Sequence, residues 1–342
     1  MKLIRFSIGD EAPRLGLVAN DCALAFDALQ SASGQRHTCL DHSTAYLEAL
    51  PGSEAVAKSL LAWTTQNWAS IRPVDKPALG QVRLHAPIEV KALFDLGLTP
   101  RHLSNSVEVM LKYEKDNPQT GPLVEALRRM LQAPRPAPTP GVPERMSYYK
   151  SNLNSVCGDG TTVPWPVYTS RLDIEPELAV VYGNASQPVA GYCIFNDVSA
   201  RDVQAAEILG GFCLSKDMAK GNQLGPYLVT PDEVGDPFSM AVSVTVNGEE
   251  RYRGTTAEIS HKAEDVFRWL GMICPLTPGS VMGFGTIPDC TAMDNDVFID
   301  PGSEIAIHFE RLGTLHCKFA EPTGKLLPSR WPLRDALKRF HA

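Results

Sequence analysis

The stretch RLDIEPELAVVY, residues 171–182, decides how this chain folds. Its second half, residues 178–182, is an apolar run bounded by turn residues, which predicts a buried β-strand. Glu175 and Glu177 stand two positions apart, so on a strand their side chains project from one face. Two neighbouring carboxylates repel each other unless a cation lies between them or one is protonated. Because Pro176 cannot donate a ladder hydrogen bond, we place the pair at a strand start or edge, where the simplest interpretation is two solvated acids.

The next apolar strand runs into a second polar stretch, FNDVSARDVQ, at residues 195–204. We predict that the strand ends at Asp197 and that a helix opens at Ser199, with Asp202 completing a capping box three residues later. Asp197 is then either a turn residue or a third oxygen ligand beside the two glutamates. Three carboxylates suit a hard divalent cation such as Mg²⁺, Mn²⁺ or Ca²⁺.

Several other polar side chains are further candidates for a site. Arg201 and Gln204 lie three residues apart, so we expect them to share one helix face near that cation. The stretch at residues 94–105 carries one histidine, and residues 214–222 carry two lysines beside a Gly-Asn loop. A single histidine is more often structural than catalytic, and such lysines are usually solvated. Neither stretch by itself therefore indicates a site.

The composition is that of a globular protein. Of 342 residues, 44% are hydrophobic and 21% are charged, which excludes a disordered chain, a fibrous repeat and a disulfide-stapled miniprotein. The length predicts about two domains. The net charge of −7 and the lack of a basic stripe argue against nucleic acid as a partner.

The sequence also predicts where the protein is located. No apolar run reaches the roughly 20 residues needed to span a bilayer, and residues 1–9 lack the apolar core of a signal peptide. We therefore expect no membrane association and a cytoplasmic protein. The eight cysteines are scattered, with no C-x-x-C pair, which favours buried free thiols in a reducing compartment.

Hydrophobic patterning predicts a mixed α+β chain dominated by antiparallel sheet. Residues 1–85 are predicted to form a small unit of short strands followed by helices. Helical composition at residues 107–132 is interrupted by Gly121-Pro122, and the proline-rich residues 133–143 are expected to form an exposed, extended connection. Further strands are expected at 178–182, 191–195, 242–246, 303–309 and 314–319, and helices at 199–209 and 264–272. Asn247-Gly248 predicts a hairpin turn.

In combination, these stretches resemble the fumarylacetoacetate hydrolase superfamily. Four motifs in order carry the resemblance: Glu175-x-Glu177, the run from Asn196 to Gln204, Lys216 nine residues before Gly225-Pro226, and Gly283-Phe284-Gly285-Thr286. It covers about residues 90–320, and the preceding region is similar to the small N-terminal domain of many members. The resemblance implies a small α+β domain at 1–85, a β-rich catalytic domain of the family's type at 86–342, and a homodimer.

The resemblance also implies a metal site. The family's acidic triad falls on Glu175, Glu177 and Asp197. Members closest to fumarylacetoacetate hydrolase itself add an aspartate seven residues before a catalytic histidine, and Asp95 and His102 have that spacing. Asp95 is thus the expected fourth ligand of a divalent cation, with Mg²⁺ expected and Mn²⁺ or Ca²⁺ as alternatives. His102 is the expected base that activates water.

Further roles follow from the resemblance residue by residue. The family's arginine, glutamine and lysine fall on Arg201, Gln204 and Lys216, its substrate-contacting threonine on Thr286, and a tyrosine before the metal segment on Tyr149. The chain departs from the family pattern after Lys216 and after Thr286, at substrate-facing positions. The acidic residue that orients the histidine has three candidates, which are Asp289, Asp294 and Glu304.

The activity implied is metal-dependent hydrolysis of a carbon–carbon bond in a 1,3-dicarbonyl acid of the acylpyruvate, fumarylpyruvate or fumarylacetoacetate type, in aromatic-compound catabolism. The substrate would chelate the cation, His102 would deprotonate water, and Lys216, Arg201 or Gln204 would stabilise the oxyanion. β-Keto acid decarboxylation, keto–enol isomerisation and sugar-acid dehydration use the same site in this superfamily. A non-catalytic ligand-binding member is a further alternative. Asp95 together with His102 favours hydrolysis.

Overall fold

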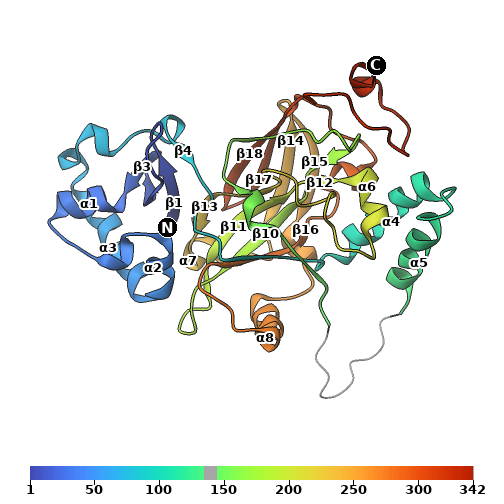
Figure 1. Ribbon diagram of the computed structural model, residues 1–342. Helices are drawn as coiled ribbons and strands as arrows, with labels where there is room; N and C mark the ends of the chain where they lie inside the picture. Colours follow the sequence, from blue (N-terminus) through green and yellow to red (C-terminus); the bar gives the residue numbers. More distant parts are fainter. Residues whose placement is uncertain (135–144, 342) are drawn as a thin grey trace.

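The computed structural model describes residues 1–134 and 145–341, which fold into one large and one smaller β-sheet with helices around them (Figure 1). This confirms the predicted α+β, strand-rich class. The extended connection expected at residues 133–143 lies almost entirely outside the described residues.

The larger sheet has the strand order β3-β2-β1-β13-β11-β10-β16-β5-β6, with β4 beside β1 and β7 beside β13. Its strands are β1 (Lys2–Ser7), β2 (Arg14–Ala19), β3 (Cys22–Ala25), β4 (Arg83–Leu84), β5 (Ala92–Leu96), β6 (Tyr148–Lys150), β7 (Val156–Cys157), β10 (Pro176–Tyr182), β11 (Val189–Asp197), β13 (Asn222–Val229) and β16 (Ser280–Thr286). The strand predicted after the Glu-Pro-Glu segment is therefore β10, and Pro176 is its first residue, as expected. However, β10 pairs on both sides, so it is an interior strand.

The smaller sheet has the order β15-β14-β17-β18-β8. Its strands are β8 (Thr161–Val163), β14 (Ala241–Val246), β15 (Glu249–Thr255), β17 (Glu304–Phe309) and β18 (Gly313–Phe319), and a separate short pair is formed by β9 (Leu172–Asp173) and β12 (Ser199–Ala200). Asn247 and Gly248 join β14 to β15 with φ of 53° and 82°. Positive φ at both central residues is what a tight hairpin turn requires, so the predicted hairpin is confirmed.

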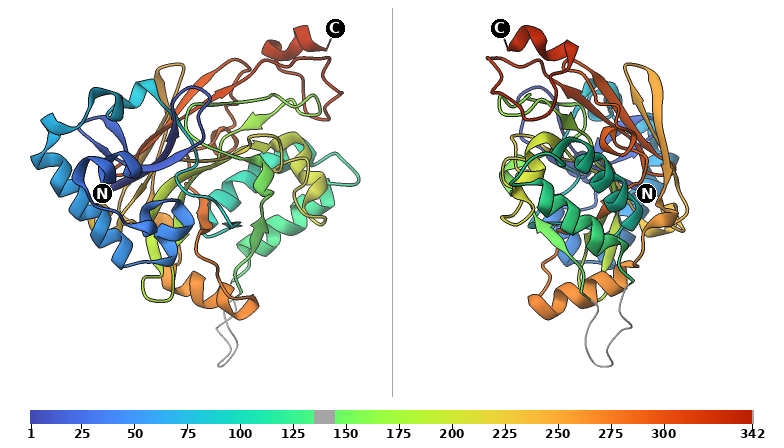
Figure 2. Two further views of the ribbon diagram at one scale, coloured as in Figure 1. Left: turned by 60° about the vertical axis from the view of Figure 1, so that its left-hand side comes forward. Right: turned by 90° about the vertical axis from the view of Figure 1, so that its right-hand side faces the viewer.

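Most of the α-helices lie at one of two ends of the larger sheet. The α-helices are α1 (Phe26–Ser33), α2 (Ser43–Glu48), α3 (Gly52–Gln66), α4 (Pro100–Glu114), α5 (Gly121–Gln132), α6 (Arg201–Glu207), α7 (Pro231–Val234), α8 (Ala263–Ile273) and α9 (Ala292–Asn295). Short 3₁₀ turns span Thr38–Leu40, Trp68–Ser70, Pro73–Asp75, Leu79–Gln81, Leu153–Ser155, Thr256–Glu258 and Asp335–Phe340. Helices α1 to α3 lie at one end and α4 to α6 at the other (Figures 1 and 2). Within the described residues, no helix is long and apolar enough to cross a membrane.

The helix expected at residues 199–209 begins later than predicted. Ser199 lies in β12, opposite Asp173 of β9, and α6 begins at Arg201 without a side-chain cap. The predicted capping box is therefore wrong. The Ser199 hydroxyl instead donates to Glu175 over 2.9 Å, which supplies a donor to a buried carboxylate. The first N–H of α6, on Arg201, donates to the Arg171 carbonyl over 2.8 Å and needs no side-chain cap.

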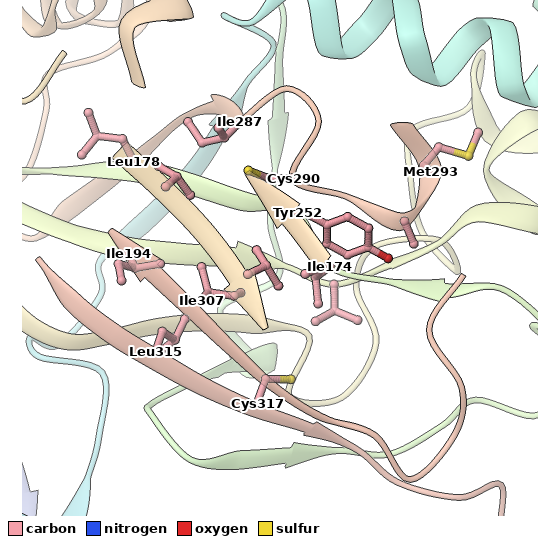
Figure 3. Close-up of a cluster of buried hydrophobic side chains, with 14 of the residues drawn as sticks. Ile174, Leu178, Ile194, Tyr252, Ile287, Cys290, Met293, Ile307, Leu315 and Cys317 are labelled. Atoms are coloured by element: carbon pink, nitrogen blue, oxygen red, sulfur yellow. The ribbon is translucent and has the colours of Figure 1, made fainter. Parts of the chain in front are cut away.

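Alternation along β10 builds a core on each face of the larger sheet. Leu178 and Val180 face the smaller sheet, within the apolar cluster of Figure 3 that also holds Ile307 of β17. Ala179 and Val181 face the other way and pack with the N-terminal region. Two of the apolar residues that meet them there come from β1 and α2, namely Leu3 and Leu47. All eight cysteines are free thiols; Cys193, Cys290 and Cys317 are buried, whereas Cys213 and Cys274 are exposed, contrary to expectation.

The N-terminal region shares its sheet with the later strands of the chain. Strand β1 pairs antiparallel with β13, with Leu3 opposite Leu228. Sheet and core are thus continuous between residues 1–85 and the later strands. The division into two domains at that point stays a prediction.

We expect Val180→Ala to lower the free energy of unfolding by about 2–3 kcal/mol, because Val180 is fully buried between the sheets and the change removes two methyl groups. Val74→Ala is the matched control, since Val74 is 68% exposed. The measurement is urea unfolding of both variants. Equal effects of the two substitutions would contradict this description of the core.

Candidate active site

Three predicted metal ligands lie on one face of the larger sheet. Asp95 is on β5, Glu177 on β10 and Asp197 on β11. Each lies two positions from an apolar residue, so it projects from the same face of its strand as that residue. These apolar residues, Leu93, Ala179 and Phe195, pack with the N-terminal region. Glu175 precedes β10, and its backbone accepts from the Asp197 N–H over 3.1 Å while its own N–H donates to Asn196 over 3.0 Å. The structure therefore brings all four predicted ligands together.

Three of these four carboxylates are buried, whereas the Asp95 side chain is 14% exposed. Glu177 and Asp197 have no exposed surface and Glu175 is 3% exposed, so the interpretation as two solvated acids at a sheet edge is wrong. Burial and the surrounding carboxylates raise the pKa of Glu177 well above its ordinary value. Burial also raises the pKa of Asp197, against the opposing charge of Lys216.

Lys216 lies among the carboxylates rather than in solvent. Its Nζ contacts Glu175, lies 2.5 Å from Asp197 Oδ2 and 3.6 Å from Asp95 Oδ2. Burial disfavours its charge, but Asp197 and Glu175 outweigh burial and hold its pKa well above the ordinary value. The residue is thus a buried ammonium inside the predicted site, and the alternative of a solvated loop lysine is wrong.

Arg201 supplies the second buried cation. It donates from Nε to Asp173 over 2.8 Å, and from Nη1 to Glu175 over 2.5 Å and to Gln204 over 3.3 Å. The contact with Gln204 agrees with the predicted shared helix face. Burial opposes the Glu175 charge, but Arg201 and Lys216 outweigh it and hold the pKa of Glu175 well below its ordinary value. Within the described residues, Arg201 Nη2 is buried and has no hydrogen-bond partner.

Asp173 is a site residue that the sequence reasoning missed. Besides Arg201, it accepts from the backbone N–H groups of Ala292 and Met293, each over 2.9 Å, at the start of α9. It is fully buried, and it ties Arg201 to α9. The signal was present in the sequence, because Asp173 extends the spacing of Glu175 and Glu177 by one further period of two.

His102 lies in the first turn of α4 and faces both α9 and the carboxylates. Its Nδ1 is 2.8 Å from Asp294 Oδ1, and its Nε2 is 3.3 Å from Glu175 Oε1. Asp294 is thus its acidic partner among the three candidates, since Asp289 binds Arg101 and Glu304 pairs with a lysine of β18. Burial favours a neutral imidazole, but the charges of Asp294 and Glu175 outweigh it and raise the pKa of His102 to about 9.

Thr286 and Tyr149, the predicted substrate contacts, lie at the same site. The Thr286 hydroxyl and the Gly285 N–H both donate to the Glu177 carboxylate over 3.1 Å. Gly283 leaves room for the same carboxylate, because a Cβ at that position would collide with it. Tyr149 stands on β6 opposite Asp95, and burial together with the charge of Asp217 raises the pKa of its hydroxyl.

The donor chemistry of this cluster fits a divalent cation. Six carboxylates meet there, on Asp95, Asp173, Glu175, Glu177, Asp197 and Asp294, against the two permanent cations Lys216 and Arg201. Asp197 Oδ1 is buried and has no partner in the described part of the chain. An excess of buried carboxylate oxygens with unused lone pairs is what a hard cation requires.

The ligands are nevertheless not arranged as a finished cage. Within residues 1–134 and 145–341, no three acidic, histidine or cysteine side chains are already set to hold a metal ion. Instead, the Lys216 ammonium lies between Glu175 and Asp197. The cation role of the four predicted ligands therefore stays a prediction, and it requires that Lys216 share or release these two carboxylates.

Comparison with known proteins supports the predicted family. Residues 122–320, more than half of the chain, match the model of the fumarylacetoacetate (FAA) hydrolase C-terminal domain. The human mitochondrial oxaloacetate tautomerase is 33% identical over 184 residues, which cover 51% of this chain and 59% of that protein. The chain thus matches only about 60% of the length of its curated relatives.

Solved structures show the same fold over nearly the whole chain. The maleylpyruvate hydrolase from Sphingobium sp. SYK-6, in complex with manganese(II) and pyruvate, has a TM-score of 0.61 at 16% identity and covers 94% of this chain and 100% of that chain. The 5-carboxymethyl-2-hydroxymuconate delta-isomerase from Mycobacterium smegmatis has a TM-score of 0.60 at 20% identity, covering 94% and 99%. The predicted family and its fold type are confirmed.

We expect the pKa of His102 in EDTA-treated protein to lie near 9 and Asp294→Asn to lower it, because the substitution removes the strongest charge that favours the imidazolium. The measurement is an NMR titration of protein with ¹³C-labelled histidine, with His102→Gln assigning the signal. A pKa that does not move in Asp294→Asn would contradict the pairing.

We expect Glu177→Ala to abolish binding of Mn²⁺, because Glu177 is one of the four predicted ligands and is fully buried. The measurement is calorimetric titration of EDTA-treated protein. Glu304→Ala, on an exposed glutamate of β17, is the control and should bind as the unmodified protein does. Full metal content in Glu177→Ala would overturn the assignment.

Proposed function

This chain belongs to the fumarylacetoacetate hydrolase family, and we propose that it is a metal-dependent hydrolase that cleaves a carbon–carbon bond in a 1,3-dicarbonyl acid. The observation that carries the proposal is the position of His102. Its Nδ1 is engaged by Asp294, and its Nε2 is directed at the carboxylate cluster. A buried histidine oriented in this way by an aspartate is suited to proton transfer beside a bound substrate.

The four acidic side chains Asp95, Glu175, Glu177 and Asp197 would hold the cation. When bound, a divalent cation supplies a Lewis acid that polarises the carbonyl oxygens of the substrate. The carboxylates would orient the dicarbonyl group by holding that cation in place. Thr286 and the Gly285 N–H keep the Glu177 carboxylate in position for this role.

His102 would act through Nε2, because Nδ1 is occupied by Asp294. It takes a proton from water, which attacks a carbonyl carbon of the substrate. Arg201 Nη2, which has no partner among the described residues, and Lys216 donate hydrogen bonds to the oxyanion that forms. When the carbon–carbon bond breaks, the imidazolium returns its proton to the departing carbanion, and two acids are released.

A second candidate is keto–enol tautomerisation of a β-keto acid such as oxaloacetate. Two observations favour it. The curated relative at 33% identity is named an oxaloacetate tautomerase, and the raised pKa of His102 favours a protonated imidazole that can donate as well as accept. In that reaction His102 would move a proton between carbon and oxygen with no attacking water.

The experiment is an absorbance assay of enol loss with acylpyruvates, fumarylpyruvate and oxaloacetate, in Mg²⁺ or Mn²⁺ and then in EDTA. Product analysis separates the candidates: two acids indicate hydrolysis, whereas equilibration of keto and enol forms with no cleavage indicates tautomerisation. Cleavage should stop in EDTA and return with added metal. No metal-dependent cleavage of any dicarbonyl acid in the panel would overturn the hydrolase proposal.

We expect His102→Ala to lower kcat by about 10²–10⁴-fold, the usual contribution of general acid–base catalysis, while Mn²⁺ affinity is retained. Because the base must be neutral, the rate in the unmodified protein should rise with pH through the pKa of His102 and fall below it. His316→Ala, on an exposed histidine of β18, is the control. Equal loss of metal and activity in His102→Ala would instead make His102 part of the metal site.

A further inference from the structure

We propose that the C-terminal strap, residues 326–341, is a positioning device that holds α4, α6 and α9 in register around the active site, with Trp331 and Ser329 as its main contacts. The match to the family model ends at residue 320, before the strap begins. In Figure 1 the C-terminal segment lies above α6, on the side of the molecule where α4 and α5 also lie. Helices α4, α6 and α9 carry His102, Arg201 and Asp294.

The contact with α4 is made by Trp331, which is 2% exposed. Its Nε1–H donates to Glu114 Oε1 over 2.6 Å, and its ring stacks on Tyr113 with centroids 4.3 Å apart. Glu114 is the last residue of α4 and is itself buried, accepting further bonds from Asn117 and Thr120. The strap thus fixes the far end of the helix whose first turn carries His102.

The contact with α6 is made by Ser329, whose hydroxyl donates to Asp202 Oδ2 over 2.6 Å. Asp202 is buried, directly follows Arg201, and also accepts from the N–H and hydroxyl of Ser170. Further along the strap, the Pro332 carbonyl accepts from Arg171 Nη2 over 2.6 Å. The backbone carbonyl of Arg171 in turn accepts from the Arg201 N–H over 2.8 Å.

The contact near α9 is made by Arg334. It donates to the carbonyls of Ile299 and Phe298 over 2.7 and 2.6 Å, shortly after the helix that carries Asp294. Helix α4 is also joined to the end of α9, because the Tyr113 hydroxyl donates over 2.6 Å to Asp296, the residue that follows α9. Tyr113 is the residue on which Trp331 stacks, so one strap residue supports both partners of the His102–Asp294 pair.

The strap donates hydrogen bonds to two buried carboxylates on the helices that it contacts. Glu114 and Asp202 are buried carboxylates, and each loses a hydrogen-bond donor if the strap contact is removed. Both stand on helices that deliver a reacting group. Because a displacement of about 1 Å in a catalytic group can reduce the rate by about 100-fold, loosening either helix should affect turnover without any change in the site's own residues. The strap itself contributes no side chain to the carboxylate cluster in the residues that the structure describes.

The experiment compares Ser329→Ala, Ser329→Thr, Trp331→Phe and Trp331→Ala by hydrogen–deuterium exchange and by kinetics on the substrate found active. We expect Ser329→Ala to speed exchange in the first turn of α6 and Trp331→Ala to speed it in the first turn of α4. We expect kcat to fall at least tenfold in both, with KM changed less than threefold. Ser329→Thr keeps the hydroxyl and should restore unmodified behaviour, and Trp331→Phe keeps the stacking and should be intermediate.

Lys338→Ala is the control within the strap, because Lys338 is exposed and pairs only with Asp335 among the described residues. A merely structural strap would lower the melting temperature while leaving kcat and the exchange of both first turns within twofold of the unmodified protein, and that result would overturn the proposal. Ser329→Ala and Trp331→Phe keep the test decisive if Trp331→Ala does not fold. The kinetic measurement depends on the proposed function, because it needs an active substrate. Hydrogen–deuterium exchange does not depend on it. A protein inactive on every substrate, with exchange altered as expected, would therefore count against the activity alone.

Discussion

The arrangement of this protein depends on a buried excess of negative charge. Glu175, Glu177 and Asp197 lie almost without solvent contact, and only two permanent cations of the described residues stand among them. Charges of one sign repel strongly where water is excluded, so such a cluster persists only if protons, the buried ammonium and guanidinium, or a bound dication offset it. The pKa shifts of Glu175 and Glu177 reflect this imbalance. Arg201 and Lys216 lower the pKa of Glu175, whereas burial and the neighbouring carboxylates raise the pKa of Glu177.

The scaffold around the cluster keeps these charges in place. Strand β10 packs apolar side chains on both faces of the larger sheet and begins at Pro176, immediately beside the acids. Backbone N–H groups and hydroxyls then hold single carboxylates, as Gly285 and Thr286 do for Glu177. Helices α4, α6 and α9 carry His102, Arg201 and Asp294, respectively, and place these side chains at the carboxylate cluster. Both proposed reactions, hydrolysis and tautomerisation, require a proton-transfer group held in a fixed orientation.

Sequence reasoning found the parts of the site whose signal is local. The spacing of Glu175 and Glu177 and the end of a strand at Asp197 follow from the period of a β-strand. The prediction from sequence failed where a tertiary contact replaces the local contact that the sequence pattern indicates. Ser199 matches a helix cap in sequence but donates to Glu175 in the fold. Asp173 shares the two-residue spacing of Glu175 and Glu177, but no local pattern shows that it binds Arg201, 28 positions away, or the start of α9.

The class of fold, the family and the residue types of the site can all be inferred from the order of amino acids alone, because hydrophobic periodicity and short motifs are properties of neighbouring positions. Folding was needed to select Asp294, rather than Asp289 or Glu304, as the partner of His102, since that contact joins residues 192 positions apart. Folding also buries Lys216 between two carboxylates, and it brings the last residues of the chain to the ends of α4 and α6. Burial and long-range pairing depend on how distant segments pack, and no local pattern carries that information.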